Sequence, residues 1–160
     1  MTDWKGLWMK YKPILLQVGL ALLAGGLASL LGGDTSSLYQ RLVSPPLAPP
    51  GWVFPVVWTV LYVLMGVAAG LIVKSEDVDS CQALAWYCLQ LGLNVLWPLM
   101  FFRFERISFS AVWLLLLTAA VYVTWQRFRA INPTAGWLLV PYLAWCLFAL
   151  YLNIGFAVLN

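Results

Sequence analysis

The sequence contains no histidine and very little charge. Histidine is the commonest general base and the commonest protein ligand for metals and haem, so its absence excludes His-based catalytic triads and His-ligated cofactors. Charged residues make up 9% of the 160 residues, whereas a soluble globular domain usually carries about 25%. A chain with so few charges lacks the polar material to cover a soluble surface.

Cysteine is also scarce. The three cysteines, Cys81, Cys88 and Cys146, lie within or beside apolar segments. An odd number without a C-x-x-C spacing argues against a disulfide framework and against a zinc site, so we interpret them as packing residues and predict neither metal nor cofactor. The net charge of +3 lies outside the apolar segments, and no basic patch is interleaved with aromatics. Nucleic acid is therefore not an expected partner.

Apolar residues dominate the chain, at 63% of the sequence with a mean hydropathy of +0.87. This composition indicates an all-α integral membrane protein whose surroundings are the lipid bilayer. The first apolar run is long and no A-x-A-like site follows it, so we interpret it as a spanning helix and not as a cleavable signal peptide. We predict a single membrane domain over residues 1–160, a bundle of five transmembrane helices joined by short loops and one long proline-rich loop between helices 1 and 2. The helices are expected at residues 13–31, 51–74, 81–102, 107–127 and 136–159.

The distribution of lysine and arginine favours a cytoplasmic N-terminus, most simply in a bacterial cell membrane. Six of these residues fall on the side of the N-terminus and three on the opposite side, which follows the positive-inside rule. The six are Lys5, Lys10, Lys12, Lys74, Arg127 and Arg129, and the three are Arg41, Arg103 and Arg106. No charged residue lies in the middle of a predicted span, which argues against an ion-coupled pump.

Residues 44–66 run from a proline cluster directly into an apolar helix. Four prolines fix their own φ angles and disfavour helix at the residues before them, so the cluster is expected to be stiff and extended, with helix beginning at about Gly51. They are Pro45, Pro46, Pro49 and Pro50. Loops of this length often form lids over functional sites.

Small residues recur every four positions on the first two predicted helices. They are Ala21, Gly25, Ser29 and Gly33 on the first helix, and Gly66 and Gly70 on the second. Ridges of this kind let two helix backbones approach closely. Packing within the bundle is the plainer interpretation, and a homodimer seam is the alternative.

Aromatic and amide side chains share one face on each of three predicted helices. The stripes are Trp58, Tyr62, Met65 and Ala69; Trp86, Gln90, Asn94, Trp97 and Phe101; and Pro141, Trp145, Ala149 and Asn153. Pro98 has no N–H for the carbonyl of Asn94, which predicts a helix kink beside that amide. A single stripe is more often packing, but three together indicate a shared aromatic ligand pocket with a few hydrogen-bonding groups.

Three dense motifs follow one another along the chain. The first is P-x-x-x-P-P-x-W-x-x-x-x-x-W-x-x-L-Y-x-x-M-G from Pro45 to Gly66, the second Q-x-x-x-N-x-x-W-P-x-x-F-F from Gln90 to Phe102, and the third P-Y-L-A-W-x-x-F-A-x-x-L-N from Pro141 to Asn153. Together they resemble the tryptophan-rich sensory protein family, which also contains the mitochondrial translocator protein, or peripheral benzodiazepine receptor.

This resemblance implies a five-helix bundle, usually a homodimer, that binds porphyrins and synthetic aromatic ligands in a pocket beneath its first loop. Trp58 and Trp145 match two tryptophans implicated in light-driven porphyrin breakdown in bacterial relatives. Leu47 and Gly51 depart from the Trp and Arg usual there, and the C-terminal segment lacks the sterol motif of animal members. Carried over by position, the ligand-binding residues are Trp52, Trp58, Tyr62, Asn94, Trp97, Trp145, Ala149 and Asn153, beneath a lid of Pro45, Pro49 and Pro50.

The leading hypothesis is therefore a membrane protein that binds protoporphyrin IX or a related aromatic molecule, for sensing, sequestration or transport. Trp58 and Trp145 would flank the macrocycle, Asn94 would supply a polar contact, and Arg41 would lie near the propionates. One alternative is a porphyrin-degrading photoenzyme with the same two tryptophans as electron donors, and another is a passive lipid or sterol carrier. Stacking tryptophans serve all three, and no acid, base or metal site points to catalysis.

Overall fold

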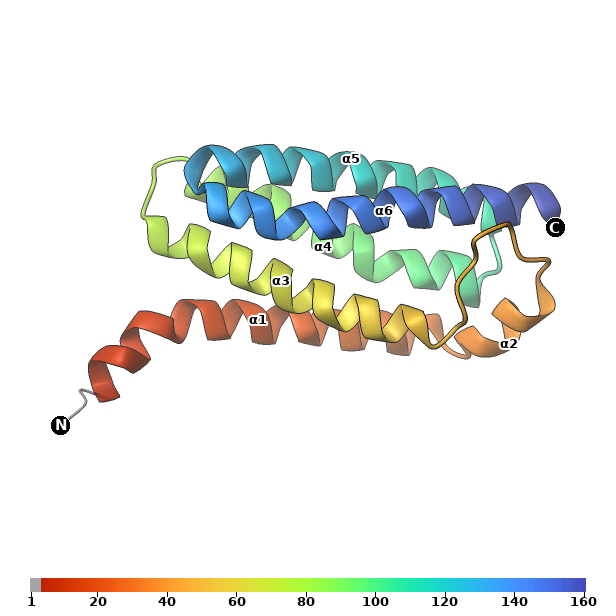
Figure 1. Cartoon of the computed structure of the whole chain (residues 1–160), viewed down its shortest axis with the longest axis horizontal. Helices are drawn as coiled ribbons and strands as arrows, with labels where there is room; N and C mark the ends of the chain where they lie inside the picture. The colour runs from red at the N-terminus through yellow and green to blue at the C-terminus, as the bar shows by residue number, and fades with distance from the viewer. Residues whose placement is uncertain (1–3) are drawn as a thin grey trace.

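The computed structural model describes the backbone of residues 4–160 and the side chains of residues 8–160, so the side chain of Lys5 lies outside the described part. Its elements are α1 (Trp4–Gly32), α2 (Thr35–Arg41), α3 (Val53–Ser75), α4 (Ser80–Pro98), the π-helical segment η1 (Leu99–Arg103), α5 (Ile107–Ile131) and α6 (Pro133–Leu159). Five helices in the described part are long and apolar enough to cross a membrane. The predicted all-α membrane fold is confirmed, and the helices lie roughly parallel or antiparallel along one axis (Figure 1).

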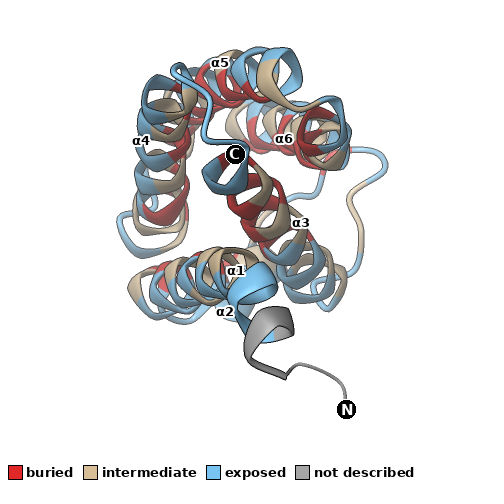
Figure 2. Ribbon diagram, turned by 90° about the vertical axis from the view of Figure 1, so that its left-hand side faces the viewer, coloured by how far each residue is buried: buried red, intermediate tan, exposed pale blue. Residues whose placement is uncertain are grey.

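The five spanning helices form a closed ring in the order α1, α3, α6, α5, α4 (Figure 2). α1 packs chiefly on α3, and α5 packs chiefly on α6. The main core joins buried side chains of these helices, among them Met65, Phe128 and Tyr142. α1 buries the smallest share of its span, so much of its surface is left for lipid.

The first helix is longer than predicted, because Pro13 lies inside α1 and does not begin it. Proline deprives the carbonyl four residues earlier of its helical partner. That carbonyl belongs to Met9, which is 68% exposed and lies at the end of the span. Head groups and water are available there to satisfy it, so the cost of an internal proline is small.

The long loop contains a helix that we did not predict, the seven-residue α2. Asp34 caps it: the Asp34 carboxylate accepts hydrogen bonds from the Ser36 hydroxyl (2.8 Å) and the Ser37 backbone N–H (3.3 Å). These hydrogen bonds, that of Ser36 foremost, lower the pKa of Asp34. A capping aspartate before a short helix is a recognisable start pattern, but the apolar content of TSSLYQR is too low to suggest a helix.

After α2 the chain is non-helical up to α3, as the prolines predict, although it is not extended throughout. The backbone turns at Pro45, whose carbonyl accepts a hydrogen bond from the Ala48 N–H (3.2 Å). Within this turn Leu47 has a φ of 66°, a left-handed conformation that is uncommon for a residue other than glycine.

Pro98 interrupts the third spanning helix, as expected for a residue that lacks a backbone N–H. Regular α-helix ends at Pro98, and the chain continues as the π-helical η1. The N–H of Phe104 bonds to the carbonyl of Leu99 over 3.0 Å. π segments accommodate an extra residue within a helix and are common beside functional sites.

Small residues of α1 and of α3 each pack against larger residues of the other helix: Gly66 and Gly70 lie against α1, and Gly25 lies against the Tyr62 ring. A Cβ atom added at Gly66 would overlap the Val18 backbone, and one at Gly70 would lie 2.5 Å from the Cα of Ile14. The ridges therefore serve bundle packing. The predicted homodimer stays a prediction, and it has to use a surface other than the Gly66 and Gly70 ridge.

We expect Gly66→Ala to destabilise the protein by about 1–3 kcal/mol, because the new methyl group forces two helix backbones apart. Gly92→Ala on α4 is the matched control, since nothing lies within 4 Å of a Cβ built there. The measurement is the thermal unfolding midpoint in mild detergent. Equal midpoints for the two variants would show that the α1–α3 contact is not close.

Candidate ligand cavity

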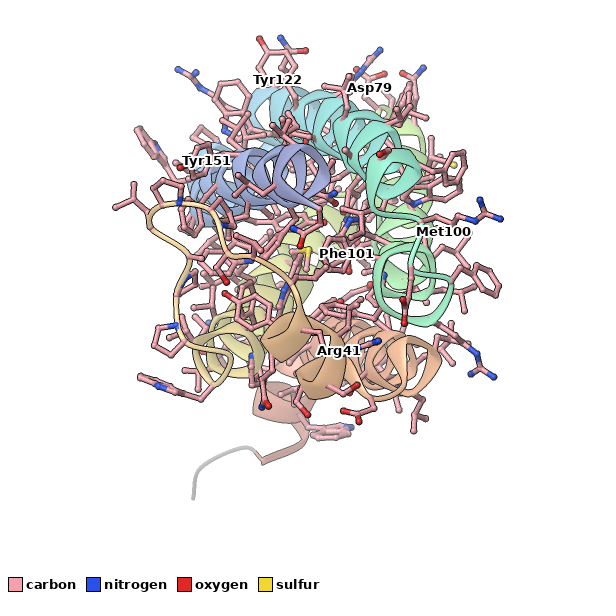
Figure 3. All side chains as sticks on the ribbon, turned by 90° about the vertical axis from the view of Figure 1, so that its right-hand side faces the viewer. Arg41, Asp79, Met100, Phe101, Tyr122 and Tyr151 are labelled. Atoms are coloured by element: carbon pink, nitrogen blue, oxygen red, sulfur yellow. The ribbon has the colours of Figure 1, made fainter. Side chains whose placement is uncertain are left out.

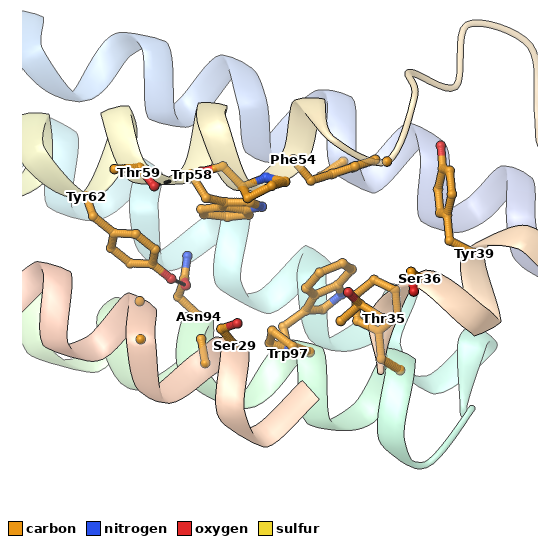
Figure 4. Close-up of a pocket in the computed structure, with 18 of the residues that line it drawn as sticks. Ser29, Thr35, Ser36, Tyr39, Phe54, Trp58, Thr59, Tyr62, Asn94 and Trp97 are labelled. Carbon is orange, nitrogen blue, oxygen red and sulfur yellow. Dashed lines mark hydrogen bonds between the residues drawn. The ribbon is translucent and has the colours of Figure 1, made fainter. Parts of the chain in front are cut away.

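A cavity of about 510 Å³ lies inside one end of the ring, between α1, α3 and α4 (Figure 4). Leu114 of α5, Leu117 of α5 and Ala149 of α6 also line it. This volume falls in the range of about 300–1,000 Å³ typical of small-molecule sites. The lining is predominantly apolar with a few polar groups, which suits an amphiphilic organic ligand.

Two tryptophans are among the aromatic residues that line the cavity. Trp58 comes from α3 and Trp97 from α4, and they line the cavity from different sides (Figure 4). The ring of Trp58 lies 5.8 Å from that of Tyr62 and 6.2 Å from that of Tyr142. Trp97 contacts Phe101, with ring centroids 5.3 Å apart. Because neighbouring rings support both indoles, they present fixed flat surfaces.

A buried hydrogen-bond network forms the inner end of the cavity. The Tyr62 hydroxyl donates to Asn94 Oδ1 (2.5 Å), and Asn94 Nδ2 donates to the Tyr142 hydroxyl (2.8 Å). The Tyr142 hydroxyl in turn donates to Gln90 Oε1 (2.7 Å). All four residues are buried, and buried polar groups joined in this way fix each other's positions. Of the four, Tyr62 and Asn94 face the cavity.

α2 forms the other end of the cavity, with Thr35, Ser36, Tyr39 and Gln40 in the lining. Leu38 anchors α2 by packing in a buried cluster with Phe101; Figure 3 shows Phe101 near the middle of this end of the bundle. The Tyr39 hydroxyl donates to the Pro49 carbonyl (2.6 Å), and burial raises the pKa of Tyr39. A short, largely polar helix is thus fixed over an otherwise apolar cavity.

Five of the eight predicted ligand-binding residues line this cavity: Trp58, Tyr62, Asn94, Trp97 and Ala149. They come from α3, α4 and α6, so the structure brings together the three stripes seen in the sequence. The other three residues lie elsewhere.

Trp52 and Trp145 lie outside the cavity. Trp52 precedes α3 and is 70% exposed. Trp145 lines a separate apolar groove of about 420 Å³ between α3 and α6. Phe54 lines the cavity and contacts Trp145 with ring centroids 5.9 Å apart. Trp145 therefore contacts Phe54, a residue of the cavity wall, and does not line the cavity itself. The stripe on α6 covers more of the helix circumference than the cavity occupies.

Asn153 is buried behind Trp97 and supports it. Its Oδ1 accepts hydrogen bonds from Trp97 Nε1 (3.0 Å) and the Ser110 hydroxyl (3.1 Å). Its Nδ2 donates to the carbonyl of Ile107 (2.9 Å). Asn153 thus holds Trp97 by one hydrogen bond, is itself fixed to α5 by the other two, and is outside the cavity lining.

The proline cluster is fastened to α6 and does not cover the cavity. Pro45 packs against Gly155, and the Tyr151 hydroxyl donates to the carbonyl of Pro46 (2.9 Å). Pro45, Pro49 and Pro50 are absent from the cavity lining, and Gly51 is the loop residue that reaches it. Instead, α2 covers the cavity.

Arg41 also stays outside the lining. Its guanidinium forms a 2.9 Å ion pair with Glu105 in the α4–α5 connection, and both side chains are more than half exposed. The pair ties α2 to the connection that follows η1.

Sequence reasoning missed Phe54, Tyr39 and Tyr142. Phe54 and Tyr39 line the cavity, and their rings contact each other 5.4 Å apart. Tyr142 directly follows Pro141 in the third motif and is out of step with the stripe that contains Trp145. Asn94 was the available signal, because a buried amide needs partners for both its oxygen and its nitrogen, although this need does not by itself identify Tyr142.

Comparison with known proteins decides the family. Residues 17–159 match the model of the TspO/MBR family. The chain belongs to the TspO/MBR family. It is 35% identical to "Tryptophan-rich protein TspO" of Chlorobaculum tepidum over 92% of this chain and 95% of that protein. It is 40% identical to "Tryptophan-rich sensory protein" of Cereibacter sphaeroides over 72% of each chain, and 36% identical to "Translocator protein" of Bos taurus over 88% of each.

Membership of the TspO/MBR family confirms the resemblance carried by the three motifs. With the five spanning helices, it makes this a multi-pass integral membrane protein. A sensory or transport role in a membrane fits this family.

Replacing Asn153 by Leu is expected to cost about 1–3 kcal/mol of stability, because Trp97, Ser110 and Ile107 each lose a buried hydrogen-bond partner. Thr124→Val is the control, since the buried Thr124 hydroxyl bonds only to the Ala120 carbonyl of its own helix (2.8 Å). Thermal unfolding without ligand measures the effect. Wild-type stability in Asn153→Leu together with weakened ligand binding would show that Asn153 contacts ligand directly.

Proposed function

We propose that this protein binds a porphyrin of the protoporphyrin IX type, or a similarly flat aromatic molecule, in the cavity between α1, α3 and α4. The observation that carries the proposal is the pairing of two supported indoles, Trp58 and Trp97, in one cavity with a buried amide network at its inner end. Flat aromatic faces favour offset stacking with a conjugated ring. The polar groups at each end supply orientation.

The inner network recognises the ligand through the hydrogen-bonding capacity of Asn94 that its own contacts leave unused. Asn94 gives its oxygen to Tyr62 and one amide hydrogen to Tyr142, which leaves a second amide hydrogen and a second lone pair. Asn94 lines a largely apolar cavity, in which an unpaired polar group is costly. A ring nitrogen or a carbonyl on the ligand satisfies this requirement.

The α2 end suits the carboxylates of such a ligand. Thr35 and Gln40 offer hydrogen-bond donors at the end of the cavity nearest the loops. Arg41 follows Gln40, and its ion pair with Glu105 is solvent-exposed. Exposed ion pairs contribute at most about 1 kcal/mol, so Arg41 is able to exchange Glu105 for a ligand propionate.

Binding for sensing, sequestration or transport explains the structure better than photochemical degradation does. The photoenzyme hypothesis places both Trp58 and Trp145 beside the ligand, and of the two only Trp58 lines the cavity. A passive lipid or sterol carrier does not require the polar network at the inner end. The hydrogen-bonded end of the cavity therefore favours a ligand with polar atoms in its ring system.

Ala149→Phe is expected to weaken saturable quenching of tryptophan fluorescence by protoporphyrin IX. The added ring enters the cavity lining, and overpacking on this scale costs about 1–3 kcal/mol. Leu147→Phe is the matched control two residues away, since Leu147 is 55% exposed on the outer face of α6. Unchanged affinity in a folded Ala149→Phe protein would place the ligand outside this cavity.

Illumination separates the binder from the photoenzyme. Phe keeps most of the aromatic area of Trp but is much harder to oxidise, so Trp58→Phe and Trp145→Phe should both retain binding. For a binder, the wild type and both variants bleach the porphyrin at the rate of free tryptophan in detergent. A distinct product that forms only in light, and only with Trp58 and Trp145 intact, would establish the enzyme instead.

A further inference from the structure

Two lysines from different helices meet over one aromatic ring at the end of the bundle opposite α2. The Lys10 ammonium lies 5.7 Å from the centre of the Tyr11 ring, and the Lys74 ammonium lies 6.0 Å from it. Lys10 and Tyr11 begin the span of α1, and Lys74 ends that of α3. Both ammonium groups are within reach of a cation–π interaction with the same ring.

The packing of α1 on α3 forces this arrangement. Gly66 lies against Val18, and four residues further along α3 Gly70 lies against Ile14. The two helices run antiparallel, so each step of four residues forward on α3 matches four residues backward on α1. The next step places Lys74 opposite Lys10. Two like charges are thus brought together by the glycine contacts that hold the helices.

Neither ammonium has a carboxylate partner in the described part of the chain. The ion pair found there is Arg41 with Glu105, at the opposite end of the bundle. The acidic residues nearest to Lys74 in sequence are Glu76, Asp77 and Asp79, in the connection after α3, and Asp77 uses a carboxylate oxygen to accept the Asp79 backbone N–H (2.9 Å). Like charges gathered at one ring repel, and a bound anion removes that cost.

We propose that Lys10, Tyr11 and Lys74 form a binding site for the phosphate of an anionic phospholipid headgroup. The three residues stand at the ends of two spans, which is the depth of the headgroup phosphates. Two ammonium groups provide charge, and the Tyr11 hydroxyl is available as a further hydrogen-bond donor. The side with more lysine and arginine faces the cytoplasm under the positive-inside rule, and the cytoplasmic leaflet is rich in anionic lipid.

The experiment counts lipids bound to the full-length protein by native mass spectrometry from neutral detergent. The probes are dioleoyl phosphatidylglycerol and dioleoyl phosphatidylcholine, which share acyl chains and differ in net charge, and inorganic phosphate is tested as competitor. The variants are Lys10→Gln, Lys74→Gln and Lys74→Arg. Lys12→Gln is the matched control, because Lys12 is exposed on α1, two residues from Lys10 and thus on another face of the helix.

The expected result is one phosphatidylglycerol bound in preference to phosphatidylcholine, weakened about fivefold by Lys10→Gln or Lys74→Gln, on the basis of about 1 kcal/mol for each basic residue. Lys74→Arg and Lys12→Gln should bind like the wild type. Equal weakening by Lys12→Gln, or equal binding of the two lipids, would show only diffuse attraction and overturn the proposal. Displacement of the lipid by inorganic phosphate at comparable concentration would overturn the assignment to a lipid. Exposed lysines leave the core intact, so unfolding does not confuse these outcomes.

Discussion

The close approach of α1 to α3 determines where the buried hydrogen-bond network and the cavity lie. Gly66 and Gly70 have no side chains, so the Val18 and Ile14 backbones of α1 lie directly on α3. In a membrane there is little hydrophobic force between helices, so close van der Waals packing of this kind holds them together. The same contact fixes the register of the two helices over their whole length.

That register places an aromatic side chain of α3 against a third glycine, which belongs to α1. The Tyr62 ring lies against Gly25, where a Cβ atom would come within 2.5 Å of it. Tyr62 can then reach Asn94 across the ring of helices, and the network continues to Tyr142 and Gln90. Beyond Tyr62 the cavity begins between α1 and α3, and Trp58 lines it.

The fold and the inner half of the cavity were predictable from the sequence, because they depend on patterns local to single helices. Apolar runs gave the spans, and steps of three and four residues placed Trp58, Tyr62, Asn94 and Trp97 on inward faces. The outer half of the cavity was harder to predict from the sequence. The part played by Asn153, and the displacement of Trp145 to an outer groove, depend on how far each helix is rotated about its axis, and a single-helix pattern leaves that rotation open. α2 was not predicted, because its seven residues are held in place by Leu38 and by contacts with residues that are distant in the sequence.

A structure determined with protoporphyrin IX bound would test the account most directly. We predict a macrocycle between Trp58 and Trp97, with its ring near Asn94 and its propionates toward α2 and Arg41. A macrocycle seated in the outer groove between α3 and α6 beside Trp145, with the inner cavity empty, would contradict it.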